Sequence, residues 1–226
     1  MNILRSVLIL ASLALSTQAF AQPDEWDMGK MRMVLLRSTG VGASGAALGA
    51  KHRAEIDRLI ATGDVVIAGP VEGSGDLREI VVFRTDSEEI AAKRIHALPL
   101  VATGALKPDP ITWFAGRKAI QRAAMPIERT DYVFGLLVKG DAPAQSVEEL
   151  KRIQEGHMAN INRLAKEGKI VLAGPFVDGG DRRGVFIFKV PTLEEAQALT
   201  DTDPAVKAGR LKIELYRWSI PKGILK

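Results

Sequence analysis

The feature that most limits how this chain can fold is an internal repeat of domain length. His157 follows His52 by 105 positions, and the Ala-Gly-Pro sequence at 173–175 follows the one at 68–70 by the same distance. Four more pairs share this offset: Gly63 and Gly168, Pro99 and Pro204, Gly104 and Gly209, and Trp113 and Trp218. Solenoid repeats have periods of roughly 20–50 residues. The longer period here predicts a duplicated domain.

Both copies show the same order of strand and helix patterns. In the second copy, Ser146 followed by Glu149 forms a capping box, and Gly168 stands where a helix would end, so a helix is expected between them. Short apolar runs around glycine-rich turns predict strands. The other elements expected in this copy are strands over 132–138, 169–177, 183–190 and 211–220 and a helix over 192–200, with Thr192 as its cap. Those expected in the first copy are strands over 31–37, 64–71, 78–85 and 111–116 and helices over 47–61 and 87–97.

The order strand, helix, strand, strand, helix, strand is that of a ferredoxin-like unit. Its antiparallel sheet carries helices on one face, so the other face has to be buried against something. We therefore expect an α+β fold in which two βαββαβ units pack as an intrachain α/β barrel, a pseudo-dimer within a monomeric chain. The expected domains are 31–117 and 131–220, joined by residues 117–130.

The repeated glycines, prolines and tryptophans have structural interpretations. The Gly-Pro pairs are expected where a strand passes into a turn, because proline cannot donate to the sheet. Trp113 and Trp218 are expected as core anchors. The stretches EGSGDLR and DGGDRRG do not follow the phosphate-loop pattern and are interpreted as hairpin loops.

The first 21 residues have the layout of a secretory signal peptide. Arg5 is followed by the apolar run Val7–Leu15 and by Ala19-Phe20-Ala21, a small-x-small cleavage site. The apolar run is shorter than the about 20 residues that a membrane-spanning helix needs. We expect cleavage after Ala21, a periplasmic or secreted protein, and no stable membrane anchor.

Composition excludes several classes of function. The net charge is +4, with basic and acidic residues interspersed, and aromatic residues make up 5% of the chain. This pattern lacks the basic stripe and stacking platform of a nucleic-acid-binding protein. Three histidines and no cysteine give poor support to a metal site. No nucleophile elbow is present. No metal, cofactor or nucleic acid is expected, and the expected partner is an unidentified small molecule.

Three stretches carry a resemblance to a known family. EGHMANINRLAKEGKIVLAGP (155–175), DTDPAVKAGRL (201–211) and LYRW (215–218) are similar to the YCII-related family. The resemblance implies a ferredoxin-like unit that pairs as a dimeric α/β barrel, and a functional His–Asp pair that falls on His157 and Asp203. Asp201 is a rival for the carboxylate.

The first copy departs from the pattern of the family. It retains His52, but Leu98 stands at the position of Asp203, and His96 aligns with Asp201 and cannot replace a carboxylate. The resemblance therefore implies a degenerate first site, in which His52 has no acid partner and is the weaker candidate.

Two functions from different classes remain open. His157 lies on the same helical stripe as Ile161 and Leu164, which is compatible with either a core histidine or a functional one. One hypothesis is an exported small-molecule enzyme of isomerase or lyase type, with its substrate in the barrel cavity and a His–Asp dyad that transfers protons. The alternative is a non-catalytic exported binding or structural protein that retains the fold.

Overall fold

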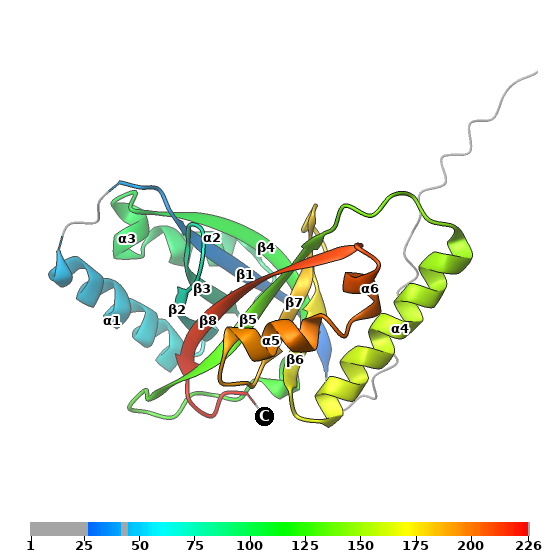
Figure 1. Cartoon of the computed structure of the whole chain (residues 1–226). Coiled ribbons are helices and arrows are strands. Elements are labelled where there is room, and N and C mark those ends of the chain that lie inside the picture. The colour runs from blue at the N-terminus through cyan, green and yellow to red at the C-terminus, as the bar shows by residue number, and fades with distance from the viewer. Residues whose placement is uncertain (1–26, 42–44, 226) are drawn as a thin grey trace, which may run out of the picture.

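The two halves of the molecule have the same order of elements (Figure 1). The structure is a computed structural model that describes residues 27–41 and 45–225. The first half contains β1 Met28–Ser38, α1 Ala46–Thr62, β2 Val65–Glu72, β3 Leu77–Phe83, α2 Glu88–His96, α3 Pro99–Ala102 and β4 Leu106–Gly116. A 3-10 turn, η3 Arg117–Ala119, follows. The second half contains β5 Arg129–Lys139, α4 Val147–Lys166, β6 Ile170–Pro175, β7 Arg182–Phe188, α5 Leu193–Thr200, α6 Pro204–Lys207 and β8 Leu211–Pro221. The short helices α3 and α6 are additions to the expected elements.

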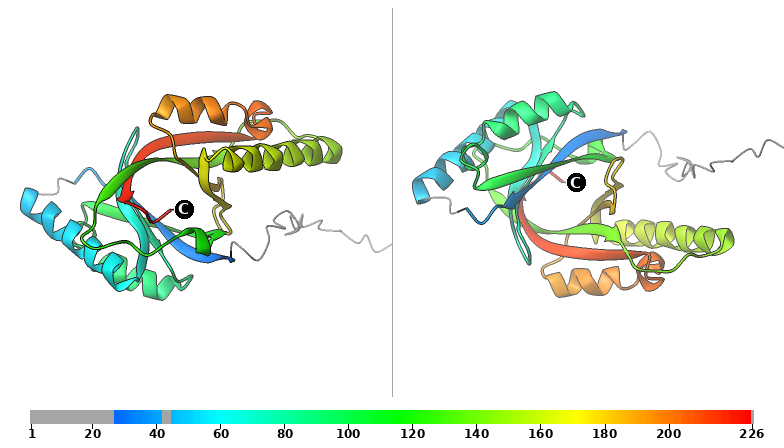
Figure 2. Two further views of the ribbon diagram at one scale, coloured as in Figure 1. Left: turned by 90° about the horizontal axis from the view of Figure 1, so that it is seen from below. Right: turned by 90° about the horizontal axis from the view of Figure 1, so that it is seen from above.

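The described strands form one antiparallel sheet that curls into a barrel. Their order is β4-β1-β3-β2-β8-β5-β7-β6, so β2 and β8 join the two halves. At that seam Val71 pairs with Trp218. At the opposite seam an isolated bridge joins Trp113 of β4 to Phe176, directly after β6. The curled sheet with helices on its outside is visible in Figure 2. The α+β fold with an intrachain barrel is thus confirmed.

Local sequence signals place the ends of the helices. The Ser146 hydroxyl accepts a hydrogen bond from the Glu149 N–H at 3.2 Å, and the Thr192 hydroxyl accepts one from the Glu195 N–H at 3.1 Å. Both expected caps are therefore present, and each satisfies a backbone donor that the first helical turn leaves unpaired. Gly168 follows the end of α4 with φ 69°, a conformation that glycine adopts without strain.

The repeated Ala-Gly-Pro sequence lies where the two halves meet. Trp218 Nε1 donates to the Gly69 carbonyl oxygen, and Trp113 Nε1 donates to the Gly174 carbonyl oxygen, each at 3.2 Å. A Cβ atom on Gly69 would lie 1.7 Å from the Ser219 carbonyl oxygen. Glycine is therefore required because the last strand of one half crosses close to the second strand of the other.

The expected position of the Gly-Pro pairs is only half correct. Gly69 and Pro70 lie inside β2, which continues to Glu72, whereas Pro175 is the last residue of β6. Pro70 is tolerated within β2 because this strand forms only a short ladder with β8, beginning one residue later at Val71.

Apolar side chains from both halves fill the inside of the barrel. Trp113, Trp218 and Phe134 are fully buried there, and the ring centroids of Phe134 and Trp218 lie 5.4 Å apart at a near-perpendicular angle. This packing buries the sheet faces that the helices leave uncovered, as the duplication predicts. The expectation of a substrate in the barrel cavity stays a prediction.

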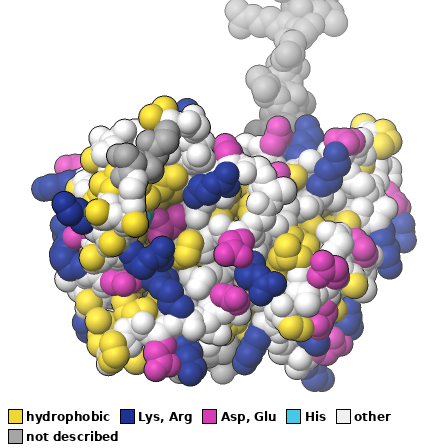
Figure 3. Space-filling view, turned by 60° about the vertical axis from the view of Figure 1, so that its left-hand side comes forward, with side chains coloured by type: hydrophobic (Ala, Val, Ile, Leu, Met, Phe, Trp, Pro, Cys, Tyr) yellow, Lys and Arg dark blue, Asp and Glu magenta, His cyan; other side chains and the backbone are white. Residues whose placement is uncertain are grey.

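Three sequence predictions concern the signal peptide, the membrane anchor and the surface charge. The signal-peptide prediction for residues 1–21 lies outside the described residues. Among the described helices, none is both long and apolar enough to cross a membrane. On the face shown in Figure 3, basic and acidic side chains are interspersed, with no large area of one sign.

Candidate functional site

His157 and Asp203 lie together in the second half. His157 projects from α4, and Asp203 is the residue directly before α6. His157 Nδ1 and Asp203 Oδ2 are 2.7 Å apart. The second carboxylate oxygen, Oδ1, accepts the N–H of Ala205 at 2.8 Å and so caps α6. Asp203 is 0% exposed, which means that these two donors satisfy a carboxylate that water does not reach.

This geometry determines which nitrogen of His157 carries the proton. An ionised carboxylate only accepts hydrogen bonds, so His157 Nδ1 has to donate to Asp203. In the neutral ring Nε2 then has a free lone pair. The side chain of His157 is 12% exposed. Its ring stacks on Phe186 of β7, with the centroids 6.0 Å apart and an interplanar angle of 25°. The imidazole is thus held at two points, with Nε2 left to act.

The rival carboxylate has a different role. Asp201 follows α5, is exposed, and accepts a hydrogen bond from Gln197 Nε2 at 2.7 Å. It therefore closes the end of its own helix, and Asp203 is the acid that contacts His157.

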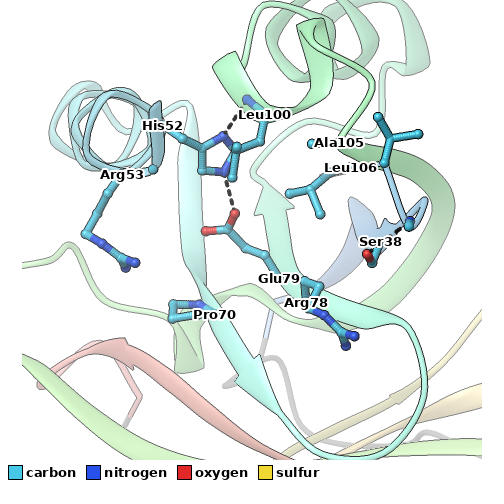
Figure 4. Close-up of a pocket in the computed structure, with 12 residues that line it drawn as sticks. Ser38, His52, Arg53, Pro70, Arg78, Glu79, Leu100, Ala105 and Leu106 are labelled. Carbon is cyan, nitrogen blue, oxygen red and sulfur yellow. Dashed lines mark hydrogen bonds and ion pairs between the residues drawn. The ribbon is translucent and has the colours of Figure 1, made fainter. Parts of the chain in front are cut away.

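The first half contains a histidine–carboxylate pair too, with a different acid. His52 Nε2 lies 2.6 Å from Glu79 Oε2, which comes from β3 (Figure 4). The N–H of Leu100 in α3 donates to His52 Nδ1 at 3.3 Å. The expectation that His52 lacks an acid partner is therefore wrong. Since Nδ1 accepts, the neutral ring carries its proton on Nε2, the reverse of His157.

The substitution at position 98 explains the reversal. Leu100 and Ala205 are equivalent residues, and both backbone N–H groups need an acceptor because they lie in the first turn of a short helix. Ala205 finds this acceptor in the Asp203 carboxylate. Leu98 has no acceptor to offer, so the Nδ1 lone pair of His52 takes that place. The other ring nitrogen, Nε2, is then directed toward the sheet, where its N–H donates a hydrogen bond to Glu79 Oε2.

The strand pattern of the sequence could have pointed to Glu79. Glu79 lies on the same face of its strand as Val81 and Phe83, whose side chains pack in the cluster beneath the helices of the first half. A charged residue on such an apolar face needs a buried partner. The equivalent residue in the second half is Gly184, where a Cβ atom would lie 2.6 Å from the Gly174 carbonyl oxygen. Each half thus has one position for a carboxylate, and the two positions differ.

A cleft of about 400 Å³ opens beside the His52–Glu79 pair. Figure 4 shows Glu79 at its centre, with Arg53 on one side and Arg78 on the other. A second cleft, of about 390 Å³, lies between α2 and the strands β1 and β4 and is lined in part by Arg32 and His96. No group of three His, Cys, Asp or Glu side chains in the described part of the chain could hold a metal ion.

Comparison with known proteins identifies the family. The model of the YCII-related domain matches residues 134–219. The uncharacterized protein YjpA of Bacillus subtilis is 30% identical over 67 residues, which cover 30% of this chain and 76% of that protein. The protein YciI of Escherichia coli is 35% identical over 74 residues, which cover 29% of this chain and 76% of that protein. This chain belongs to the YCII-related family. The matched segment of the family model contains both His157 and Asp203.

Solved structures share the barrel across both halves of this YCII-related chain. A heme-binding protein from Thermus thermophilus has a TM-score of 0.54 at 11% identity and covers 85% of this chain and 91% of its own. A dye-decolorizing peroxidase from Bacteroides thetaiotaomicron has a TM-score of 0.50 at 11% identity and covers 85% and 92%. Identities this low show a common dimeric α/β-barrel fold and nothing about shared chemistry.

Proposed function

We propose that this protein is a small-molecule enzyme of isomerase or lyase type in which His157 transfers a proton. The observation that carries the proposal is the hydrogen-bonded chain from Ala205 N–H through the buried Asp203 to His157 Nδ1. A buried, fully engaged carboxylate that fixes one imidazole nitrogen leaves the other as a general base. Membership of the YCII-related family suggests a small-molecule site. The hydrogen-bonded chain through Asp203 supports the more specific proposal of proton transfer by His157.

The steps that the chain itself can perform are limited and specific. His157 Nε2 accepts a proton from a carbon or hydroxyl group of the bound molecule, and the ring becomes a cation. Asp203 stabilises this cation through the Nδ1–H bond without taking the proton itself. The imidazolium then returns the proton to another atom of the substrate or to a leaving group. His52 cannot act in this way, because both of its nitrogens are already engaged.

The fold also raises the question of haem, because one solved relative in fold is described as heme-binding. A haem ligand needs a histidine nitrogen directed at open space. His52 has no nitrogen left for iron, and His157 packs against Phe186 in the cluster on the helix side of the sheet, not inside the barrel. The inside of the barrel, where a large group would have to enter, is filled by Trp113 and Trp218. These residues do not fit haem, and we derive no step through it.

A second candidate function is non-catalytic binding. The observation in its favour is that the two clefts described above both lie in the first half, away from His157. A protein that only binds a ligand would use these clefts, and the His157–Asp203 pair would then serve to join α4 to α6.

The test is proton exchange measured by NMR in D₂O on a panel of ketones, keto acids and β-substituted acids. A substrate of the wild-type protein should lose about 10²–10⁴-fold in rate with His157→Gln, because a general base is removed. The matched control is Lys151→Gln, which alters an exposed residue of the same helix, α4, outside the dyad and outside both clefts. His52→Ala should cost far less than His157→Gln. Equal rates for wild-type protein and His157→Gln would refute the proposal, and binding without exchange would favour the second candidate.

A further inference from the structure

The cleft of the first half has the construction of a ligand site. Its volume of about 400 Å³ falls within the range of about 300–1,000 Å³ that is usual for small-molecule pockets. Its walls are largely apolar and come from three different elements or their ends, β2, α3 and β4, through Pro70, Leu100, Ala105 and Leu106. Against these walls stand a few polar groups, chiefly Glu79 and two arginines. Apolar walls with few convergent polar groups are what a small organic molecule needs.

The exposed member of the pair differs between the two halves. In the second half the histidine is 12% exposed and the carboxylate 0%. In the first half the His52 side chain is 5% exposed and that of Glu79 is 10%. Glu79 uses Oε2 for His52, and Figure 4 shows its other oxygen directed into the cleft. The more exposed member of the pair is therefore the imidazole in the second half and the carboxylate in the first half.

The charges that line the cleft specify the charge of its ligand. Arg53 is exposed, and no partner for its guanidinium is found among the described residues. Arg78 is held at the rim by its Nη1, which donates to the Gly75 and Leu77 carbonyl oxygens, each at 2.9 Å. Two guanidinium groups and the Glu79 carboxylate leave one positive charge in excess, because His52 is neutral when Leu100 N–H donates to it. One negative charge on the ligand would balance this excess.

We propose that this cleft is a second ligand site, separate from His157, that binds a small organic monoanion carrying a hydroxyl or amino donor. The donor bonds to the free oxygen of Glu79, the anionic group pairs with Arg53, and the apolar body lies against Pro70, Leu100 and Leu106. Arg78, on the other side of Glu79, adds positive charge at the rim. His52 is a positioning residue: it fixes the Glu79 carboxylate and is itself fixed by Leu100.

The experiment uses the whole protein and three related probes. 4-Hydroxybenzoate has both the anionic group and the donor, benzoate lacks the donor, and 4-hydroxybenzamide lacks the charge. Calorimetry should give the tightest binding for 4-hydroxybenzoate, with each of the other two weaker by about tenfold, as expected for the loss of one charge-assisted hydrogen bond. In the ¹H–¹⁵N spectrum the Leu100 amide should shift on binding, because its acceptor His52 is coupled to Glu79.

Two variants separate the cleft from general effects. Arg53→Gln should weaken 4-hydroxybenzoate binding about tenfold. Lys51→Gln removes the same charge from the same exposed helix but lies outside the cleft lining, so binding should be unchanged. Thermal melting verifies that both variants are folded. Equal effects of the two variants, equal affinity for all three probes, or no binding at millimolar concentration would overturn the proposal. Loss of binding with His157→Gln but not with Arg53→Gln would place the ligand in the second half, which would also overturn it.

Discussion

Replacement of Asp203 by leucine gives the second half the residue that the first half has at the equivalent position, Leu98. Two donors lose their acceptor, the Ala205 N–H and the His157 Nδ1–H. His157 could turn so that Nδ1 accepts from Ala205, as His52 accepts from Leu100. Its Nε2–H would then have no carboxylate, because Gly184 stands where the first half has Glu79.

At least one buried donor therefore stays unpaired in Asp203→Leu. An unsatisfied buried donor costs about 1–3 kcal/mol. For a chain of this size each kcal/mol lowers Tm by about 2–4 °C, so Tm should fall by about 2–12 °C. The matched control is Asp201→Leu, which alters an exposed carboxylate and should stay within about 0.5 kcal/mol of wild type. Calorimetric Tm values that are the same for the two variants would refute the reasoning that Asp203 is the buried acceptor.

Three further outcomes are expected, two from the structure and one in part from the sequence. Gly174→Ala places a Cβ atom 2.1 Å from the Phe114 carbonyl oxygen and should lower the free energy of unfolding in urea by about 1–3 kcal/mol or more, whereas Gly49→Ala, with open space in α1, should raise it by about 0.5–1 kcal/mol. Burial raises the pKa of Tyr216 to about 12 from 10.0, so stability present below pH 10.0 should be lost as the pH rises toward 12, and Tyr216→Phe should reduce that loss in melts at each pH. Intact mass and light scattering of the exported fraction should show a monomer that lacks residues up to Ala21, and a full-length chain or a stable dimer would contradict this.

The fold could be predicted from the sequence because the strand and helix pattern of each copy and the duplication of that copy both indicate the same α/β barrel. Each copy alone shows the element order, and the repeat supplies the partner that covers the bare sheet face. The His157–Asp203 pair could also be predicted from the sequence. The resemblance to the family points to both residues, and Asp203 directly precedes Pro204, a position from which it caps the short helix α6.

The pair in the first half was not predicted, and the reason is physical. Leu98 removes the expected acid, but the replacement comes from β3, a different element, so an offset of 105 positions cannot find it. Glu79 becomes a partner of His52 through strand parity and the packing of α1 on the sheet, which are properties of the folded chain. In the same way, the role of Gly69 depends on a strand of the other half that is about 150 positions away.

The most direct test of this account is the protonation site of His52 and of His157. Long-range ¹H–¹⁵N correlation spectra, recorded well above the ordinary titration range of histidine, distinguish the two neutral ring forms. His157 should carry its proton on Nδ1, facing Asp203, and His52 should carry its proton on Nε2, facing Glu79. The same ring form for both histidines would contradict the exchange of roles between the halves.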